Sequence, residues 1–376
     1  RYFRNGRLAD FGLVRKELAG KTVLVTGAAG SVGSELSVLI AGMQPRHLFL
    51  VDHAENPLVL LEPRVRRMLG PNGKVTSRIV DVTDEHAVME IMGAARPDLV
   101  YHAAAHKHVH LMEDAPAAAV RNNAWGTLVA ARCAERTGVG TFVLVSTDKA
   151  VRPTSVMGAT KRLAELALQE MAARSSTRFI AVRFGNVLGS SASVVPLFRD
   201  QILNGGPVTV THPDAERYFM SGTEAAGLIL LASAVGRAGE IFLLDMGDPI
   251  KITSLAKALI ELSGFKLGVD MEIQFIGLKP GEKLTETLHS DREMFEPTGH
   301  EKLLVMRRMA EPPRIVDRIE QFTRELDALE DEEVKRRIAA IIPEYVPAGL
   351  TSAAHKVNGT ADAGLDRERR PVAGPG

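Results

Sequence analysis

The chain has only one cysteine, Cys133, among its 376 residues. A single cysteine excludes an intramolecular disulfide and is typical of a reducing compartment, which favours a cytoplasmic location. Excess charge of either sign is also absent, because Lys plus Arg and Asp plus Glu both total 46. A chain with balanced charge gives no support for nucleic-acid binding, so nucleic acid is not an expected partner.

Long apolar runs are missing as well. No segment approaches the roughly 20 apolar residues that a membrane helix needs, and nothing at the start of the chain reads as a secretory signal. The first residue is Arg1 rather than Met, which we interpret as a sign that a segment precedes it. With 45% hydrophobic residues, the chain is long enough for one large α/β domain and a smaller lobe.

Strand-length and helix-length segments alternate after a mixed, basic lead-in over residues 1–20. Over residues 21–185 this alternation predicts a Rossmann-type doubly wound parallel sheet with helices on both faces. The predicted strands are Lys21–Thr26, Arg46–Val51, Lys74–Val80, Pro97–His102, Thr141–Ser146 and Arg178–Phe184. The predicted helices are Ser31–Met43, Pro57–Leu69, Glu85–Ala94, Ala115–Thr137 and Val156–Ala173.

The pattern loosens after residue 185. Residues 186–345 predict mainly a smaller mixed α/β lobe that binds substrate, followed by charged C-terminal helices. Residues 346–376 are rich in Gly, Ala, Pro and charge, a composition typical of a disordered tail.

Three glycines, Gly27, Gly30 and Gly33, stand between the first predicted strand and the first predicted helix. Glycines let the backbone turn tightly and approach a pyrophosphate. The helix that begins at Ser31 and Val32 offers free N–H groups and a partial positive charge. The strand–glycine–helix context favours a dinucleotide site over a purely structural turn.

Asp52 ends the second predicted strand, about 20 residues beyond the glycines, where a carboxylate accepts hydrogen bonds from the adenosine ribose. No Arg or Lys follows it directly, which favours NAD over NADP as the cofactor. The ends of the third and fourth strands add to the predicted NAD site with Asp81, Val82, Ala103, Ala104 and Ala105.

A hydroxyl, a carboxyl and an amine stand in a row after the fifth predicted strand, at Thr147, Asp148 and Lys149. They lie where an open parallel sheet binds its ligands, and Lys161 follows on the next predicted helix. Such a run can supply an acid and a base for proton transfer. A turn with a solvated ion pair is the competing interpretation, and these residues alone do not decide between the two.

Four histidines cluster after the fourth predicted strand, at His102, His106, His108 and His110. Histidine is a common metal ligand, but no nearby cysteine completes a zinc pattern. The sequence therefore predicts no metal site.

Several motifs agree in order and spacing with one family. They are HAAAHKHV, STDKAVRPTSVMGATKR, VRFGNVLGSSASVVPLF and LKPGEKLTE, together with the three glycines and Asn123-Ala-Trp-Gly126-Thr127. The chain resembles the extended short-chain dehydrogenases/reductases and, within them, the bacterial polysaccharide-biosynthesis UDP-N-acetylglucosamine 4,6-dehydratases. The resemblance runs from about Leu18 to about Ala340.

Met157 stands four residues before Lys161, where most of the superfamily has a tyrosine that acts as a base. A thioether cannot shuttle protons. The large membrane-anchored dehydratases of the subgroup share this methionine, so Met157 sharpens the resemblance and marks part of the catalytic site. Those relatives carry transmembrane helices ahead of the catalytic region, which implies a membrane anchor upstream of Arg1.

The resemblance implies hydride transfer from carbon 4 of a UDP-sugar to NAD, loss of water across carbons 5 and 6, and return of the hydride to carbon 6. Asp148 would then be the acid that protonates the leaving 6-hydroxyl, and Lys149 the base at carbon 5. Lys149 needs a lowered pKa for that role. Thr147 would bond the oxygen on carbon 4. Lys161 and Asn123 would help to bind the cofactor.

The resemblance also implies a set of substrate residues. Arg217 is suited to bind a diphosphate bidentately, and Glu282 and Lys283 would hold the uridine ribose and phosphate. Three further residues are expected near the substrate, namely Lys107, Asn186 and Val194. Relatives commonly associate through the helices that flank the Lys161 helix, so we expect a homo-oligomer.

Two alternatives stay open from the sequence. A nucleotide-sugar 4-epimerase shares the oxidation at carbon 4 but needs no acid–base pair for elimination, which argues against it here. A catalytically silent NAD-binding protein is favoured only by Met157.

Overall fold

The computed structural model describes residues 8–191, 193–290, 293–307 and 313–347. The predicted tail over residues 346–376 lies outside the described residues except for its first two, and so do the first seven residues of the predicted lead-in. The rest of the lead-in is mostly helix α1 (Leu8–Leu18), which lies against helix α10 (Gly222–Val235). No helix in the described part of the chain is both long and apolar enough to cross a membrane.

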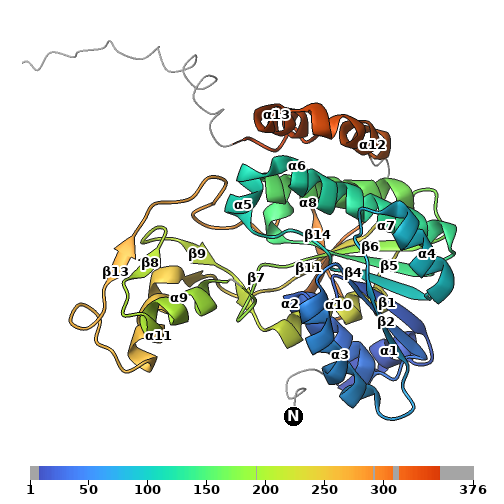
Figure 1. The fold of residues 1–376 in the computed structure, drawn as a ribbon, viewed down its shortest axis with the longest axis horizontal. Coiled ribbons are helices and arrows are strands. Elements are labelled where there is room, and N and C mark those ends of the chain that lie inside the picture. The colour runs from blue at the N-terminus through green and yellow to red at the C-terminus, as the bar shows by residue number, and fades with distance from the viewer. Residues whose placement is uncertain (1–7, 192, 291–292, 308–312, 348–376) are drawn as a thin grey trace, which may run out of the picture.

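Among the described residues, nine strands form one sheet at the centre of the molecule (Figure 1), in the order β14-β15-β11-β6-β5-β4-β1-β2-β3. Strands β1 to β6 and β11 pair in parallel, whereas β15 runs antiparallel to β11 and β14. The predicted doubly wound parallel sheet is therefore confirmed. The strands are β1 (Thr22–Thr26), β2 (His47–Asp52), β3 (Val75–Ile79), β4 (Leu99–His102), β5 (Thr141–Val145), β6 (Arg178–Arg183), β11 (Ile241–Leu244), β14 (Phe295–Pro297) and β15 (Leu303–Met306).

The direction of winding reverses at β1. From β1 the chain adds β2 and β3 on one side and then β4, β5, β6 and β11 on the other. An open α/β sheet binds its ligands outside the carboxyl ends of the strands at such a switch point. The β1–β4 junction is therefore where a site is expected.

Helices cover both faces of the sheet, so that central strands such as β1, β4 and β11 are buried along their whole length. One face carries α1, α10, α2 (Ser31–Gly42) and α3 (Glu55–Leu69), whose buried side chains share one core. The other face carries α4 (Glu85–Ala95), α7 (Gly126–Arg136), α8 (Val156–Ala172), α12 (Val316–Glu325) and α13 (Asp331–Ile341), which share a second core.

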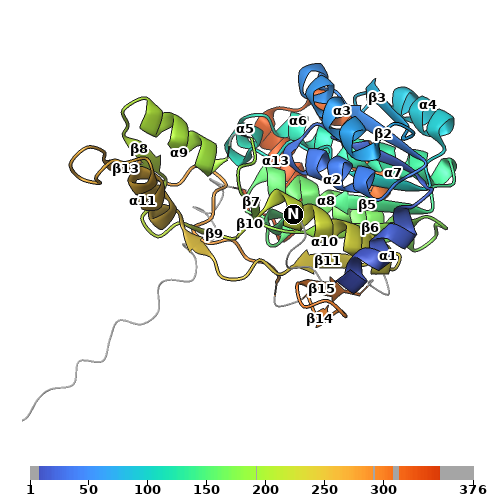
Figure 2. The same ribbon diagram turned by 90° about the horizontal axis from the view of Figure 1, so that it is seen from below.

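A smaller lobe lies to one side of the sheet (Figure 2) and has a hydrophobic core of its own. Its core residues include Phe198, Val208, Ile260 and Met271. Its elements are α9 (Val194–Leu203), β8 (Val208–Val210), α11 (Ile252–Leu262) and β13 (Ile273–Phe275). The short strands β9 (Glu216–Arg217) and β12 (Ile250–Lys251) pair with each other, and β7 (Asn186–Val187) lies between the lobe and the sheet (Figure 1).

The range 186–345, predicted to be mainly the substrate lobe, is divided between the two parts of the molecule. Strands β11, β14 and β15 join the large sheet, and α10 packs against its face. The chain thus returns to the sheet after the lobe, because β6 still has an unpaired edge that a buried strand must cover.

The helix predicted over Ala115–Thr137 is interrupted. The structure has α6 (Pro116–Ala119), then a π-helical turn over Val120–Trp125, then α7. A π turn is rare and often marks a functional site. This one contains Asn123, one of the predicted cofactor residues.

Helices α12 and α13 lie over α8 and α6 (Figure 1). Their apolar residues, among them Ile319, Phe322 and Ile338, belong to the same core as Leu163 and Leu166 of α8. The face through which the resemblance predicted self-association is therefore partly covered by the chain's own C-terminal helices.

Candidate active site

The glycine turn between β1 and α2 is packed against the end of β4. Gly27 has a φ of 63°, and a Cβ added there would lie 2.4 Å from the Ala104 backbone nitrogen. A Cβ on Gly33 would lie 2.0 Å from the Gly27 carbonyl oxygen. Helix α2 begins at Ser31 with no side-chain cap on its first N–H groups. Uncapped N–H groups above a close glycine turn fit a dinucleotide pyrophosphate.

Asp52 lies beside this turn, 7% exposed. Its carboxylate accepts bonds from the backbone nitrogens of Ala29 (2.9 Å) and Ala54 (3.0 Å). Both bonds fix the carboxylate at the end of β2, next to the glycines, where the sequence placed it.

The other predicted cofactor residues border the same edge of the sheet. Asp81 follows β3 and accepts bonds from the backbone and hydroxyl of Thr83, both at 2.8 Å. Val82 is buried against α7, where a Cβ on Gly126 would lie 2.9 Å from it.

The side-chain amide of Asn123 is hydrogen-bonded within the chain. Its amide oxygen accepts bonds from His106 N and Asn122 Nδ2, and its amide nitrogen donates to His106 O and Thr160 Oγ1. Both donors are used within the chain, so Asn123 holds the loop after β4 in place rather than offering a free donor to a ligand. Ala103, Ala104 and Ala105 belong to that loop.

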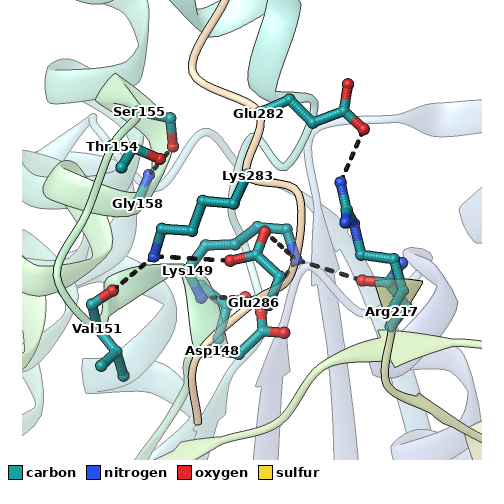
Figure 3. A network of polar contacts seen from close by, with 12 residues as sticks. Asp148, Lys149, Val151, Thr154, Ser155, Gly158, Arg217, Glu282, Lys283 and Glu286 are labelled. Carbon is teal, nitrogen blue, oxygen red and sulfur yellow. Dashed lines mark hydrogen bonds and ion pairs between the residues drawn. The ribbon is translucent and has the colours of Figure 1, made fainter. Parts of the chain in front are cut away.

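The acid and the amine predicted to do the chemistry are in contact. Lys149 Nζ lies 3.0 Å from Asp148 Oδ1 and 3.2 Å from Asn186 Oδ1. Thr147 Oγ1 donates to the same Asp148 oxygen at 2.9 Å. Asp148 is fully buried, and its second oxygen has no hydrogen-bond partner in the described part of the chain. Figure 3 shows Asp148 and Lys149 from close by.

The pKa of Lys149 is raised, whereas the role implied by the resemblance needs a lowered pKa. Burial lowers it, but the carboxylates of Asp148 and Glu286 outweigh burial and leave the pKa above its ordinary value. The expected lowered pKa is therefore wrong for the chain by itself. Arg217 is the group that opposes the two carboxylates.

Lys161 lies on α8, and its charge acts on the buried His102 and on Glu165. The residue is 3% exposed, and its Nζ has no hydrogen-bond partner among the described residues. Burial lowers its pKa to about 8, against the attraction of Glu165. A buried amine without a partner is costly, so a ligand hydroxyl at this position fits the site.

Met157 is the second residue of α8, and its side chain is buried in the core. The next residue brings α8 against the catalytic run, because a Cβ on Gly158 would lie 2.1 Å from the Lys149 carbonyl oxygen. Apart from the motif itself, nothing in the sequence indicates that position 158 needs a glycine.

Three of the predicted substrate residues, Arg217, Glu282 and Lys283, lie near the catalytic run (Figure 3). Arg217 Nη2 donates to Glu282 at 2.7 Å, and Arg217 Nη1 donates to the Leu284 carbonyl at 3.0 Å. Lys283 Nζ donates to the Val151 carbonyl at 2.9 Å. These bonds tie the segment carrying Glu282 and Lys283 to the catalytic loop.

Two predicted substrate residues lie apart from this cluster. Lys107 donates to the Ser191 carbonyl at 2.9 Å, and Ser31 Oγ accepts from Ser191 N at 3.1 Å. The loop after β7 is therefore held against both the glycine turn and the loop after β4. Val194 is the first residue of α9, which follows that loop.

Sequence reasoning missed two features. Glu286 lies beside Lys149 and is the last residue of the LKPGEKLTE motif. From this motif only Glu282 and Lys283 were predicted as site residues. Glu165 and Arg183 form a fully buried ion pair beneath the catalytic run, with Ser146 Oγ donating to Glu165 at 2.6 Å. Only the fold shows that these residues meet.

The histidine cluster does not form a metal site in the described residues. His102 is fully buried and bonds Thr26 Oγ1 at 2.7 Å and Thr127 Oγ1 at 3.0 Å. Burial and the neighbouring Lys161 lower its pKa to about 3, so it is a neutral residue of the core.

The chain is similar to several known proteins. It is 48% identical over 295 residues to the capsular polysaccharide biosynthesis protein CapD of Staphylococcus aureus, covering 78% of this chain and 49% of CapD. It is 34% identical to a UDP-glucose 4-epimerase of Rickettsia canadensis, covering 73% of this chain and 79% of that protein. The X-ray structure of Pen from Bacillus thuringiensis superposes with a TM-score of 0.71 at 31% identity, covering 77% of this chain and 90% of Pen.

These similarities define the family. The chain spans about half the length of CapD, and a family model described as polysaccharide biosynthesis protein matches residues 23–308. The match includes β1, the glycine turn, the catalytic run and the segment that carries Glu282 and Lys283. The chain therefore belongs to the polysaccharide biosynthesis protein family, on a short-chain dehydrogenase/reductase fold.

Proposed function

We propose that the chain is an NAD-dependent nucleotide-sugar 4,6-dehydratase, a lyase that acts on UDP-N-acetylglucosamine. The observation that carries the proposal is the contact of 3.0 Å between Lys149 Nζ and Asp148 Oδ1 at the carboxyl end of β5. Elimination of water needs an acid and a base side by side, whereas a 4-epimerase does not use such a pair.

The residues around the switch point fit NAD. The Gly27–Gly33 turn and the start of α2 would hold the pyrophosphate, and Asp52 would accept bonds from the adenosine ribose. Lys161, whose amine lacks a partner, would bind the nicotinamide ribose. Bound NAD supplies the hydride acceptor at carbon 4 and the hydride donor at carbon 6.

One proton shared between Asp148 and Lys149 can prepare both residues for their roles as acid and base. The contact between an Asp148 carboxylate and a Lys149 ammonium holds the same number of protons as a neutral acid beside a neutral amine. Transfer of one proton along it prepares Asp148 to protonate the leaving 6-hydroxyl and Lys149 to take the proton from carbon 5. Thr147 Oγ1 donates its one hydrogen to Asp148, so it would accept a bond from the hydroxyl on carbon 4.

The substrate would lie between the catalytic run and the lobe. Arg217 would bind the diphosphate, which then competes with Glu282 for the guanidinium. Lys283 and Asn186 border the same region, whereas Lys107 and Val194 would reach the substrate from outside this cluster. A cytoplasmic location, a membrane anchor and a homo-oligomer remain predictions from the resemblance.

Gly33→Ala should remove NAD binding, because its Cβ would overlap the Gly27 carbonyl and push the turn away from α2. We expect the NAD affinity to fall at least tenfold, roughly 1.4 kcal/mol or more, as measured by calorimetric titration. Gly93→Ala is the matched control, since nothing lies within 4 Å of a Cβ there. Equal NAD affinity in the two variants would contradict the assignment of the turn.

The test of the proposed function is incubation with UDP-N-acetylglucosamine, followed by mass spectrometry and proton NMR. Loss of one water with a new methyl doublet, and no build-up of NADH, is the expected result. A stereoisomer of unchanged mass would show a 4-epimerase instead. No product, with NAD bound and several UDP- and dTDP-sugars tried, would favour the silent NAD-binding protein.

A further inference from the structure

Glu286 lies inside the candidate active site although the chemistry described so far gives it no role. It is 5% exposed. One of its carboxylate oxygens lies 3.6 Å from Lys149 Nζ and the other lies 3.7 Å from Lys283 Nζ. Figure 3 shows the carboxylate between the two amines, which come from different parts of the chain.

The Glu286 carboxylate acts on the amines mainly through its charge. Both contacts are longer than an ordinary hydrogen bond, and its Oε2 atom is buried without a hydrogen-bond partner among the described residues. A buried carboxylate is costly unless nearby cations compensate it. Lys149 and Lys283 are the compensating cations here.

We propose that Glu286 is a positioning residue of the catalytic site, whose carboxylate holds the Lys149 amine beside Asp148 and controls how readily that amine releases its proton. The proposal rests on the proposed function, because it concerns the same acid–base pair. When Asp148 carries the proton that it will deliver, Asp148 is a neutral acid and Lys149 is a neutral amine. Glu286 is then the charged carboxylate that keeps the Lys149 side chain in place.

Four charged groups and one neutral group face the Lys149 amine. Asp148 and Glu286 favour the ammonium form, whereas Arg217 disfavours it. Lys283 and Lys149 repel each other, since each is a cation beside Glu286. Asn186 accepts a bond from the amine and carries no charge.

Two substitutions should therefore move the ionisation of Lys149 in opposite directions. Glu286→Gln removes a negative charge and should lower the pH at which the amine becomes neutral by about 1 unit. Lys283→Gln removes a positive charge and should raise it. If the substitutions only loosened the site, the pKa of Lys149 would fall toward the ordinary value of lysine in both variants.

The measurement is the pH dependence of Lys149 acetylation by acetic anhydride in the whole protein without substrate. Only the neutral amine reacts, and peptide mass spectrometry gives its extent relative to the exposed Lys257. Glu240→Gln is the matched control. The Glu240 carboxylate is buried and accepts a bond from Arg307 at the start of β11, away from the carboxyl ends of the strands, so its replacement should leave the acetylation curve unchanged.

Opposite shifts in the two variants support the positioning role. An unchanged curve in Glu286→Gln, or shifts of the same sign in both variants, would overturn it. The acetylation curve needs no turnover, so it decides the role of Glu286 even where wild-type protein yields no dehydrated sugar. In active enzyme, Glu286→Gln should also move the acid limb of the kcat profile to lower pH, because Lys149 then loses its proton more readily.

Discussion

Asp148→Asn and Lys149→Met should each lower the rate of dehydration by about 10²–10⁴-fold, and NAD should remain bound. An amide cannot deliver a proton to the leaving hydroxyl, and a thioether cannot accept the proton from carbon 5. Initial rates of product formation by mass spectrometry and calorimetric titration with NAD measure the two quantities separately.

The double variant makes this prediction sharper. Because the two side chains share one proton across the 3.0 Å contact, they act as a unit, and the double variant should be about as slow as either single variant. Asp317→Asn on α12 and Lys257→Met on α11 are matched controls at exposed positions and should keep the full rate. Retained dehydration in both single variants would remove the assignment of acid and base.

Replacement of either member of the Glu165–Arg183 pair should destabilise the protein by about 3–5 kcal/mol. Both side chains are fully buried and joined by two bonds of 2.7 and 2.6 Å. Glu165→Gln removes the carboxylate that bonds Arg183 twice and leaves Arg183 with the contact to Glu293 at 2.9 Å. Arg183→Met leaves Glu165 with the ion pair to Arg162 at 3.2 Å. The free energy of unfolding in urea at pH 7 measures the loss.

The double variant Glu165→Gln/Arg183→Met should lose less than the sum of the single losses, since neither charge then remains buried without the other. Glu85→Gln is the control: Glu85 forms an exposed pair with Arg136 at 3.0 Å, and its loss should stay within about 0.5 kcal/mol. Additive losses in the double variant would show that the pair is not coupled.

The Glu165–Arg183 pair should also make the stability of the protein fall at acid pH. Burial raises the pKa of Glu165, but the Arg183 guanidinium outweighs burial and holds the pKa at about 2, below its ordinary value of 4.5. A carboxyl whose folded-state pKa is lowered contributes stability above its unfolded pKa, and that contribution is lost as the pH falls. The difference between wild type and Glu165→Gln should therefore narrow between pH 4.5 and about pH 2.

The alternating strands and helices over residues 21–185 could be predicted because the patterns that indicate them are local in the sequence. Buried parallel strands are continuous apolar runs, and the glycine turn and Asp52 lie at fixed positions along the β1–α2–β2 unit. The interrupted helix around Asn123 was not predictable in this way. An apolar pattern over Ala115–Thr137 fits one helix, and only the packing of the loop after β4 shows why a π turn replaces part of it.

By itself the sequence determined the fold class, the family and the residues that gather at the switch point, since all of these depend on short motifs along the chain. Tertiary structure alone decided the charge state of the site. The pKa of Lys149 depends on Asp148 and Glu286 together, and Glu286 is distant in the sequence. Electrostatic interactions act through space over a few ångströms, so a group's neighbours in the sequence do not predict which charges surround it.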